Sequence, residues 1–174
     1  MKTIHVLLII LVLSSCQRNK IERTIKQITS HQVVIPEKLA VSFNRSVTEI
    51  SAEAFEGQML YVIYVDSASC ASCKIANLEV YMPLFLLSQS TKRFQLMILF
   101  YTPSKKPELM MGDASRKGYP FPIYFDTDNV FLASNPLIPA DNKYHGFLLD
   151  EKHIPILVGD PVSSSYISLV KEAL

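Results

Sequence analysis

The sequence predicts an α/β protein with a mixed central sheet that carries helices on both faces. Two nearly continuous apolar runs, Met59–Val65 and Phe94–Tyr101, are rich in β-branched and aromatic residues, which is typical of strands buried on both faces. The residues between these runs, 71–88, repeat apolar side chains at helical spacing. A hairpin pattern followed by an amphipathic helix ends the chain, so parallel and antiparallel strands are expected in one sheet.

Local signals predict the other elements. Ser46 followed by Glu49 fits a capping box, which predicts a helix from Ser46 to about Phe55. Pro83 is expected to kink or divide the helix over 71–88. The remaining expected elements are a helix over 107–117, a strand over 120–125, a hairpin formed by 145–149 and 154–158, and a helix over 163–174.

Composition limits the class of function. The 174 residues are 49% hydrophobic, so one packed domain is expected. Lys and Arg number 17 against 16 Asp and Glu, whereas binding to nucleic acid requires a clustered excess of cations. We therefore expect no nucleic-acid partner. The sequence shows no Gly-rich phosphate loop, no Ser/His/Asp triad and no helical metal motif, so neither a cofactor nor a metal is expected.

The first residues indicate a targeting segment. Lys2 precedes eight apolar residues, Val6–Leu13, which are too few to cross a hydrocarbon core of about 30 Å. The following residues, Leu13-Ser14-Ser15-Cys16, resemble a bacterial lipobox. This resemblance implies that Cys16 is lipidated and that residues 1–15 are a lipoprotein signal peptide. The alternative is an ordinary signal peptide in which Cys16 is incidental.

Lipidation would place the protein at the cell envelope, facing the periplasm from the outer or the inner membrane. Several acyl chains on one residue hold a protein firmly to a bilayer, and disulfides persist outside the cytoplasm. Residues 16–33 are interpreted as a lipidated tether and residues 34–174 as the domain. Ile21, Ile25 and Ile28 have helical spacing, so the tether includes either one weak helix or a helix that contacts the membrane surface.

The motif Cys-Ala-Ser-Cys at 70–73 carries the chemistry, because it lies where the strand 59–65 gives way to a helix pattern. Free amide groups at a helix start favour an anion, so Cys70 is expected to be a thiolate with a lowered pKa. Cys73 lies one turn further on the same face and can close a disulfide with Cys70. Three interpretations stay open: a redox pair, a structural or vestigial disulfide, and part of a zinc site completed by histidines or carboxylates.

With this motif, the later hairpin and the last helix, the chain resembles the thioredoxin-like superfamily over roughly residues 34–174. It is similar in particular to the extracytoplasmic thioredoxin-like lipoproteins of Bacteroidetes. The segments 121–126 and 145–161 fit the same pattern. The resemblance implies a thioredoxin-like three-layer fold in which Cys70 attacks a substrate and Cys73 resolves the intermediate.

Two positions depart from the superfamily. Ser69 stands where thioredoxins carry a Trp, and this chain has no Trp. His145 aligns with their cis-proline, which implies that it faces Cys70 at the start of the strand 145–149. It would there polarise the disulfide or assist proton transfer, or it would only line the strand. Asp66 is interpreted as a loop-forming residue rather than as a proton carrier.

The main hypothesis is a membrane-anchored periplasmic thiol-disulfide oxidoreductase. Its redox pair would be Cys70 and Cys73, and its partners would be envelope proteins with thiols or disulfides. One alternative is a catalytically silent thioredoxin-fold lipoprotein that acts as a protein-binding module. Another is a peroxide-reducing thiol protein, which requires Cys70 alone.

Overall fold

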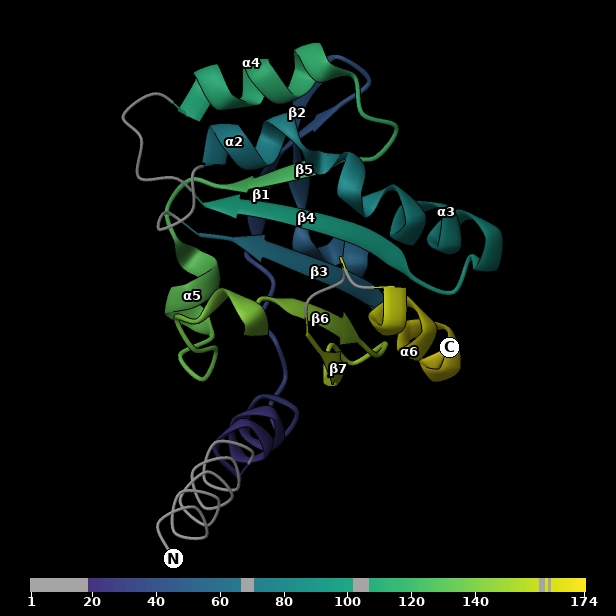
Figure 1. Ribbon diagram of the computed structural model, residues 1–174. Helices are drawn as coiled ribbons and strands as arrows, with labels where there is room; N and C mark the ends of the chain where they lie inside the picture. The colour runs from purple at the N-terminus through teal and green to yellow at the C-terminus, as the bar shows by residue number, and fades with distance from the viewer. Residues whose placement is uncertain (1–18, 67–70, 102–106, 160–161, 163) are drawn as a thin grey trace, which may run out of the picture.

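The computed structural model describes residues 19–66, 71–101, 107–159, 162 and 164–174. Within these residues, seven strands form one sheet in the order β2-β1-β5-β4-β3-β6-β7 (Figure 1). The strands are β1 (Lys38–Phe43), β2 (Ser46–Ser51), β3 (Leu60–Val65), β4 (Gln95–Tyr101), β5 (Ile123–Asp126), β6 (Gly146–Leu149) and β7 (Pro155–Val158).

Short 3-10 helices and α-helices connect the strands, and a helix over residues 19–28 precedes them. None of the helices in the described part of the chain has the length and apolar character needed to cross a membrane. The helices are η1 (Ala52–Phe55), α2 (Ala71–Ala76), η2 (Leu78–Tyr81), α3 (Met82–Thr91), α4 (Pro107–Lys117), α5 (Val130–Ser134), η3 (Asn142–Tyr144) and α6 (Ser164–Ala173).

The strand directions bring several loops to one edge of the sheet. β3, β4 and β5 are parallel neighbours, so their carboxyl ends meet at the same edge. β6 runs antiparallel to β3, with Gly146 opposite Ile63, and its first residue therefore lies near the end of β3. The chain leaves β3 at this edge, and the next described element is α2, which contains Cys73.

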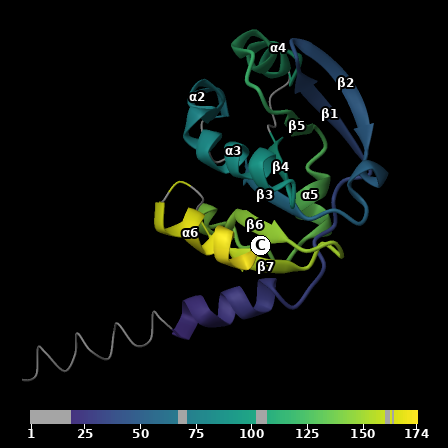
Figure 2. The same cartoon turned by 90° about the vertical axis from the view of Figure 1, so that its right-hand side faces the viewer.

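Helices cover both faces of the sheet, as Figure 2 shows with α2, α3 and α6 on one side and α5 on the other. Alternate side chains of β3 pack on opposite faces of the sheet, because successive residues of a strand point in opposite directions. Tyr61, Ile63 and Val65 join the core beneath α2, α3, α4 and α6, and the other three β3 side chains join the core beneath η1 and α5. The predicted three-layer α/β fold is confirmed.

The expected helix from Ser46 to Phe55 is wrong. Asn44 and Arg45 both have positive φ values, 50° and 61°, which form a two-residue turn suited to a hairpin. β2 therefore pairs with β1, and the Ser46 hydroxyl donates to the Phe43 carbonyl (2.8 Å) instead of capping a helix. Strand β1 was not predicted, and only η1 is helical within this region.

The predicted division of the helix over 71–88 is confirmed. The pattern separates into α2, η2 and α3, and the first break falls at Asn77, before Pro83. Pro83 lies in the first turn of α3, where proline removes no helical hydrogen bond. The expected helices over 107–117 and 163–174 and the hairpin at 145–158 are also present, whereas α5 and η3 were not predicted.

Candidate functional site

The central strand β3 directs the chain towards the Cys motif. All six β3 residues are buried, and the following residue, Asp66, is also buried. Burial on both faces fixes the strand, so the chain leaves it at the carboxyl edge of the sheet and resumes in α2 at Ala71. Cys70 lies outside the described residues, and its thiolate character stays a prediction.

Cys73 is the third residue of α2, and its side chain is exposed. Its sulfur is disulfide-bonded. The other cysteines of the chain are Cys16 and Cys70, both outside the described residues, so the predicted pairing of Cys73 with Cys70 stays a prediction. An exposed disulfide is accessible to another protein's thiol, which is the first requirement for disulfide exchange.

Helix α2 is held in place by contacts near its carboxyl end, because it has only six residues. Ile75 of this helix is buried in the core, and the Asn77 side-chain amide donates to the Cys73 carbonyl (2.7 Å). The Tyr119 hydroxyl donates to the Ile75 carbonyl (2.7 Å). Burial raises the pKa of Tyr119, which keeps this hydroxyl protonated as a donor. These contacts fix the backbone that carries Cys73.

A surface hollow of about 500 Å³ opens beside Cys73. Two apolar side chains at its rim are unusually exposed: Val80 at 46% and Val162 at 50%. Its lining residues are Cys73, Lys74, Asn77, Val80, Tyr81, Asn142 and Val162. Exposed apolar residues gathered around a hollow are typical of a docking surface.

His145 lies beside β3, directly before β6. Its backbone carbonyl accepts a hydrogen bond from the Tyr64 amide (2.8 Å), and its own amide donates to the Asn142 carbonyl (3.0 Å). All peptide bonds within the described residues are trans, so His145 does not reproduce a cis-proline backbone. The distance from His145 to Cys70 falls outside the described residues, and their contact stays a prediction.

The His145 imidazole is buried, with only 3% of the residue exposed. Nε2 lies 2.8 Å from the Pro139 carbonyl, and since a carbonyl only accepts, Nε2 carries the proton. Nδ1 is buried and has no hydrogen-bond partner among the described residues. In the neutral ring, Nδ1 is therefore a fixed proton acceptor near the end of β3.

Sequence reasoning missed the polar groups that surround this histidine. The Tyr64 ring meets the His145 ring edge-on (centroids 5.4 Å apart), and its hydroxyl donates to Asn129 Oδ1 (3.2 Å). Burial, followed by the carboxylates of Asp126 and Asp66, raises the pKa of Tyr64, so the hydroxyl stays protonated. Tyr64 lies inside an apolar strand pattern, which gave no sign of this polar contact.

Asp126 has a structural role at the same edge. It ends β5 and is buried, and its carboxylate accepts from the amides of Val130 (3.0 Å) and Phe131 (2.7 Å). These are free amides at the start of α5, so Asp126 caps that helix. Asp66 occupies the position after β3 that corresponds to Asp126 after Phe125, and it is buried rather than part of an exposed loop.

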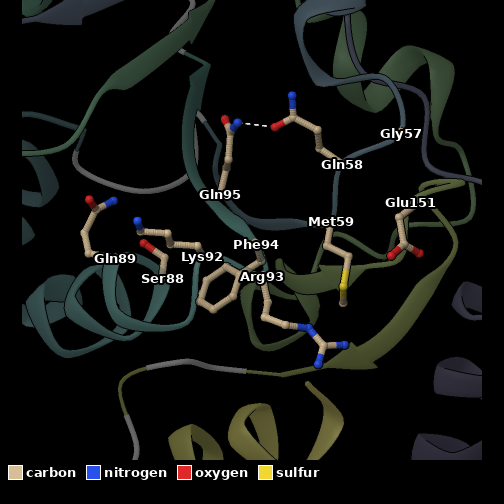
Figure 3. Close-up of a pocket in the computed structure, with 10 residues that line it drawn as sticks. All are labelled: Gly57, Gln58, Met59, Ser88, Gln89, Lys92, Arg93, Phe94, Gln95 and Glu151. Carbon is tan, nitrogen blue, oxygen red and sulfur yellow. Dashed lines mark hydrogen bonds between the residues drawn. The ribbon is translucent and has the colours of Figure 1, made fainter.

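A second hollow, of about 420 Å³, lies at the opposite end of the sheet (Figure 3). It is formed where β3 and β4 begin, and the side chains of Gln58 and Gln95 are hydrogen-bonded to each other there. Lys92 and Arg93 lie on one side of this hollow, and Glu151 lies on the other. It contains no cysteine and is separated from Cys73 by the length of the strands. Among the described residues, no cluster of three or more His, Cys, Asp or Glu side chains is suited to a metal ion.

No protein-family model matches this sequence, and no curated protein matches it. Solved structures nevertheless identify the fold, which is thioredoxin-like. A structure from Chlorobium tepidum assigned as a thiol:disulfide interchange protein, DsbE, matches with a TM-score of 0.52 at 15% identity, covering 82% of this chain and 96% of the other.

Two further structures support the same assignment. A mutant of PrxQ from Xylella fastidiosa gives a TM-score of 0.53 at 14% identity, over 82% of this chain and 91% of the other. A DsbF homologue from Corynebacterium diphtheriae gives 0.50 at 13% identity, over 80% and 86%. The structural neighbours are thus thioredoxin-fold proteins of the DsbE-like and peroxiredoxin-like kinds, and at these identities the likeness concerns the fold.

Proposed function

We propose that this chain is a membrane-anchored thiol-disulfide oxidoreductase of the cell envelope, with Cys70 and Cys73 as its redox pair. The observation that carries the proposal is the exposed, disulfide-bonded Cys73 in the helix that follows the central strand of a thioredoxin-like sheet. Lipidated Cys16 would hold the domain at the membrane, and its partners would be envelope proteins with thiols or disulfides.

In the reducing direction, the Cys70 thiolate attacks one sulfur of a substrate disulfide and releases the other as a thiolate. The Cys73 thiolate then attacks the Cys70 sulfur, which leaves a Cys70–Cys73 disulfide and a substrate with two thiols. The oxidising direction is the reverse, with the same two electrons moving to the enzyme. Because α2 has only six residues, nearby free amides stabilise the thiolate more than a helix dipole does.

His145 would carry a proton in this exchange. Its Nε2–H is fixed by the Pro139 carbonyl, so the buried Nδ1 is the nitrogen that accepts or returns a proton. His145→Gln retains a side-chain N–H for Pro139 and removes the nitrogen that would accept the proton. The rate of disulfide exchange should then fall, while the free energy of unfolding stays close to that of the wild type. A purely structural role would change the stability and leave the exchange rate of the folded protein unchanged.

The hollow beside Cys73 supports a polypeptide substrate. Val80 and Val162 offer apolar surface to a side chain near the substrate cysteine, and Lys74 is the charged side chain of the lining. A small, highly charged thiol would bury little of this surface. We therefore propose an extended segment of an envelope protein, with an apolar residue beside its cysteine, as the substrate.

Mixed disulfides provide the test. Cys73→Ser should accumulate disulfide-linked envelope proteins, because the resolving sulfur is gone, whereas the matched variant Cys70→Ser should trap none. Non-reducing gels of cells that express each variant measure this difference. Equal trapping by both variants would contradict the assigned order of attack.

A second function, that of a protein-binding module without turnover, is favoured by the backbone at His145. The trans peptide bonds and the engaged amide of this residue differ from a cis-proline, and Ser69 replaces the usual Trp. If neither cysteine variant traps a partner, and Cys70 has an ordinary thiol pKa near 8.5, the binding module replaces the oxidoreductase.

The anchor has its own test. A palmitate analogue should label the wild-type chain and not Cys16→Ala. Equal labelling of the two would show that Cys16 is not the lipidated residue, and it would leave the redox proposal unchanged.

A further inference from the structure

The helix over residues 19–28 is fastened to the domain. The last residue of the helix, Ile28, is buried together with Val33 and Ile35 of the segment that follows, and all three belong to the core on the α5 face. The Val33 amide also donates to the His153 carbonyl (2.8 Å). A segment interpreted from the sequence as a tether is therefore partly an element of the fold.

Asn135 strengthens this attachment. Its side chain accepts from the Val34 amide (2.8 Å) and donates to the Val34 carbonyl (2.8 Å), as a neighbouring strand would. The same side chain donates to the Phe131 carbonyl (2.7 Å), and Asn135 is buried. Because the backbone at Val34 is fixed in this way, the helix has a defined position beyond β7 (Figures 1 and 2).

The helix has two unlike faces. Ile21, Ile25 and Ile28 form its apolar side, and Ile25 and Ile28 pack against the domain. The opposite side carries exposed cations, since at 3.6 residues per turn Arg23 lies about 160° from Ile25. We call Lys20, Arg23 and Lys26 the basic face; all three are exposed. None of them forms an ion pair within the part of the chain that the structure describes.

The position of the basic face matches a charged membrane surface. Two residues separate Cys16 from residue 19, the first described residue of the helix, and three successive Cα–Cα steps span at most about 10 Å. The helix itself is about 15 Å long, so a lipid on Cys16 would hold all three cations near the headgroup layer. Each cation near an anionic bilayer surface contributes about 1 kcal/mol to membrane binding.

We propose that the basic face binds the anionic headgroups of a phospholipid bilayer. Since the helix is fastened to the domain by Val33–Ile35 and Asn135, this contact fixes the orientation of the whole domain relative to the membrane. The proposal rests on the lipidation of Cys16 for its location, and it does not depend on the chemistry of the redox pair.

Vesicle sedimentation tests the proposal on a chain that begins at residue 17 and has no acyl group. This chain retains every buried residue that the structure describes, the first of which is Ile28. Vesicles of equal parts phosphatidylglycerol and phosphatidylcholine should bind it, and pure phosphatidylcholine vesicles should not. Replacing Lys20, Arg23 and Lys26 together with Gln should weaken binding on the order of 100-fold at low salt.

The matched control removes three exposed cations elsewhere, through Lys92→Gln, Arg93→Gln and Lys117→Gln, and should leave vesicle binding unchanged. An equal loss of vesicle binding in the control variant would show that net charge alone determines binding, and it would overturn the proposal. So would equal binding to both kinds of vesicle, or equally strong binding to soluble polyglutamate. Disulfide exchange by the basic-face variant should be unchanged, so the failure of either proposal leaves the other standing.

Discussion

The two ends of the sheet differ in where they keep their polar groups. At the carboxyl end of the parallel strands, two carboxylates and one histidine are buried: Asp66, Asp126 and His145. At the amino end, Met59 and Phe94 are buried directly below the surface, and the charged residues Lys92, Arg93 and Glu151 line an open hollow. Both ends have a hollow, but among the described residues only the carboxyl end has buried Asp or His side chains, whereas the buried polar residue at the amino end is Ser88.

This difference distinguishes the candidate functional site from the surface at the other end. Burying an ionisable group costs free energy unless it is hydrogen-bonded, so such groups are rare where they serve no purpose. Asp126 has a purpose in capping α5, whereas the buried Nδ1 of His145 makes no hydrogen bond within the described residues. The carboxyl end therefore contains a group whose retention the fold alone does not explain.

The largest effect should come from the cysteine at the carboxyl end. Cys73→Ala should abolish the repeated reduction of a protein disulfide, because the mixed intermediate can no longer be resolved. The double variant Lys92→Ala and Arg93→Ala, at the amino end, should reduce that substrate at the wild-type rate. Turnover assays with a disulfide-bonded protein measure both, and a loss in the second variant would end the distinction between the two ends.

The apolar rim of the hollow should have the next largest effect. Val80→Asp should raise the KM for a peptide disulfide about tenfold, since burying a Val side chain is worth about 1.5 kcal/mol. Leu169→Asp on α6 is the matched control, because Leu169 is 47% exposed and Val80 is 46% exposed. An unchanged KM for Val80→Asp would show that substrates do not bury this rim.

Buried polar residues at the two ends should differ in their contribution to stability. His145→Ala should lower the free energy of unfolding by about 1–3 kcal/mol, because the Pro139 carbonyl loses its buried donor. Ser88→Ala should change it by less than about 0.5 kcal/mol, since the Ser88 hydroxyl only bonds the Phe85 carbonyl of its own helix. Urea unfolding measures both, and similar values would contradict the comparison.

The smallest effect is expected where α3 ends. Lys92 has a left-handed backbone (φ 53°, ψ 24°), which is unfavourable for any residue with a Cβ. Lys92→Gly should therefore stabilise the protein by about 0.5–1 kcal/mol, seen as a higher urea midpoint. Destabilisation would indicate that the lysine side chain makes a contact worth more than the backbone cost, and the amino end would then need a functional explanation.

Much of the fold was predictable because local patterns and tertiary packing agree. β3 and the residues 96–100 of β4 are buried on both faces, so both runs are apolar without interruption. Helix α4 has the predicted bounds, since Pro107 begins it and Gly118, with φ of 64°, follows its last residue. The failure at Ser46 has a clear reason: a capping box and a strand start look alike until the turn at Asn44 and Arg45 sets the pairing.

The candidate site was predictable in part. The position of the Cys motif after the central strand follows from the order of elements in the chain. The surroundings of His145 were not predictable, because its contacts come from Tyr64, far away in the sequence, and from Pro139 in an irregular loop. In the sequence, His145 stands between a loop and an apolar run, and this position does not indicate which imidazole nitrogen forms a hydrogen bond.

The class of fold and the place of the cysteines follow from the sequence alone, since strand burial, helix periodicity and motif spacing are local properties of the chain. The attachment of the N-terminal segment depends instead on tertiary contacts. Asn135 bonds both backbone groups of Val34 across 101 positions of sequence. An asparagine side chain can donate and accept hydrogen bonds in many local structures. The sequence therefore does not indicate that Asn135 bonds Val34, because the two residues come within 2.8 Å of each other only in the folded protein.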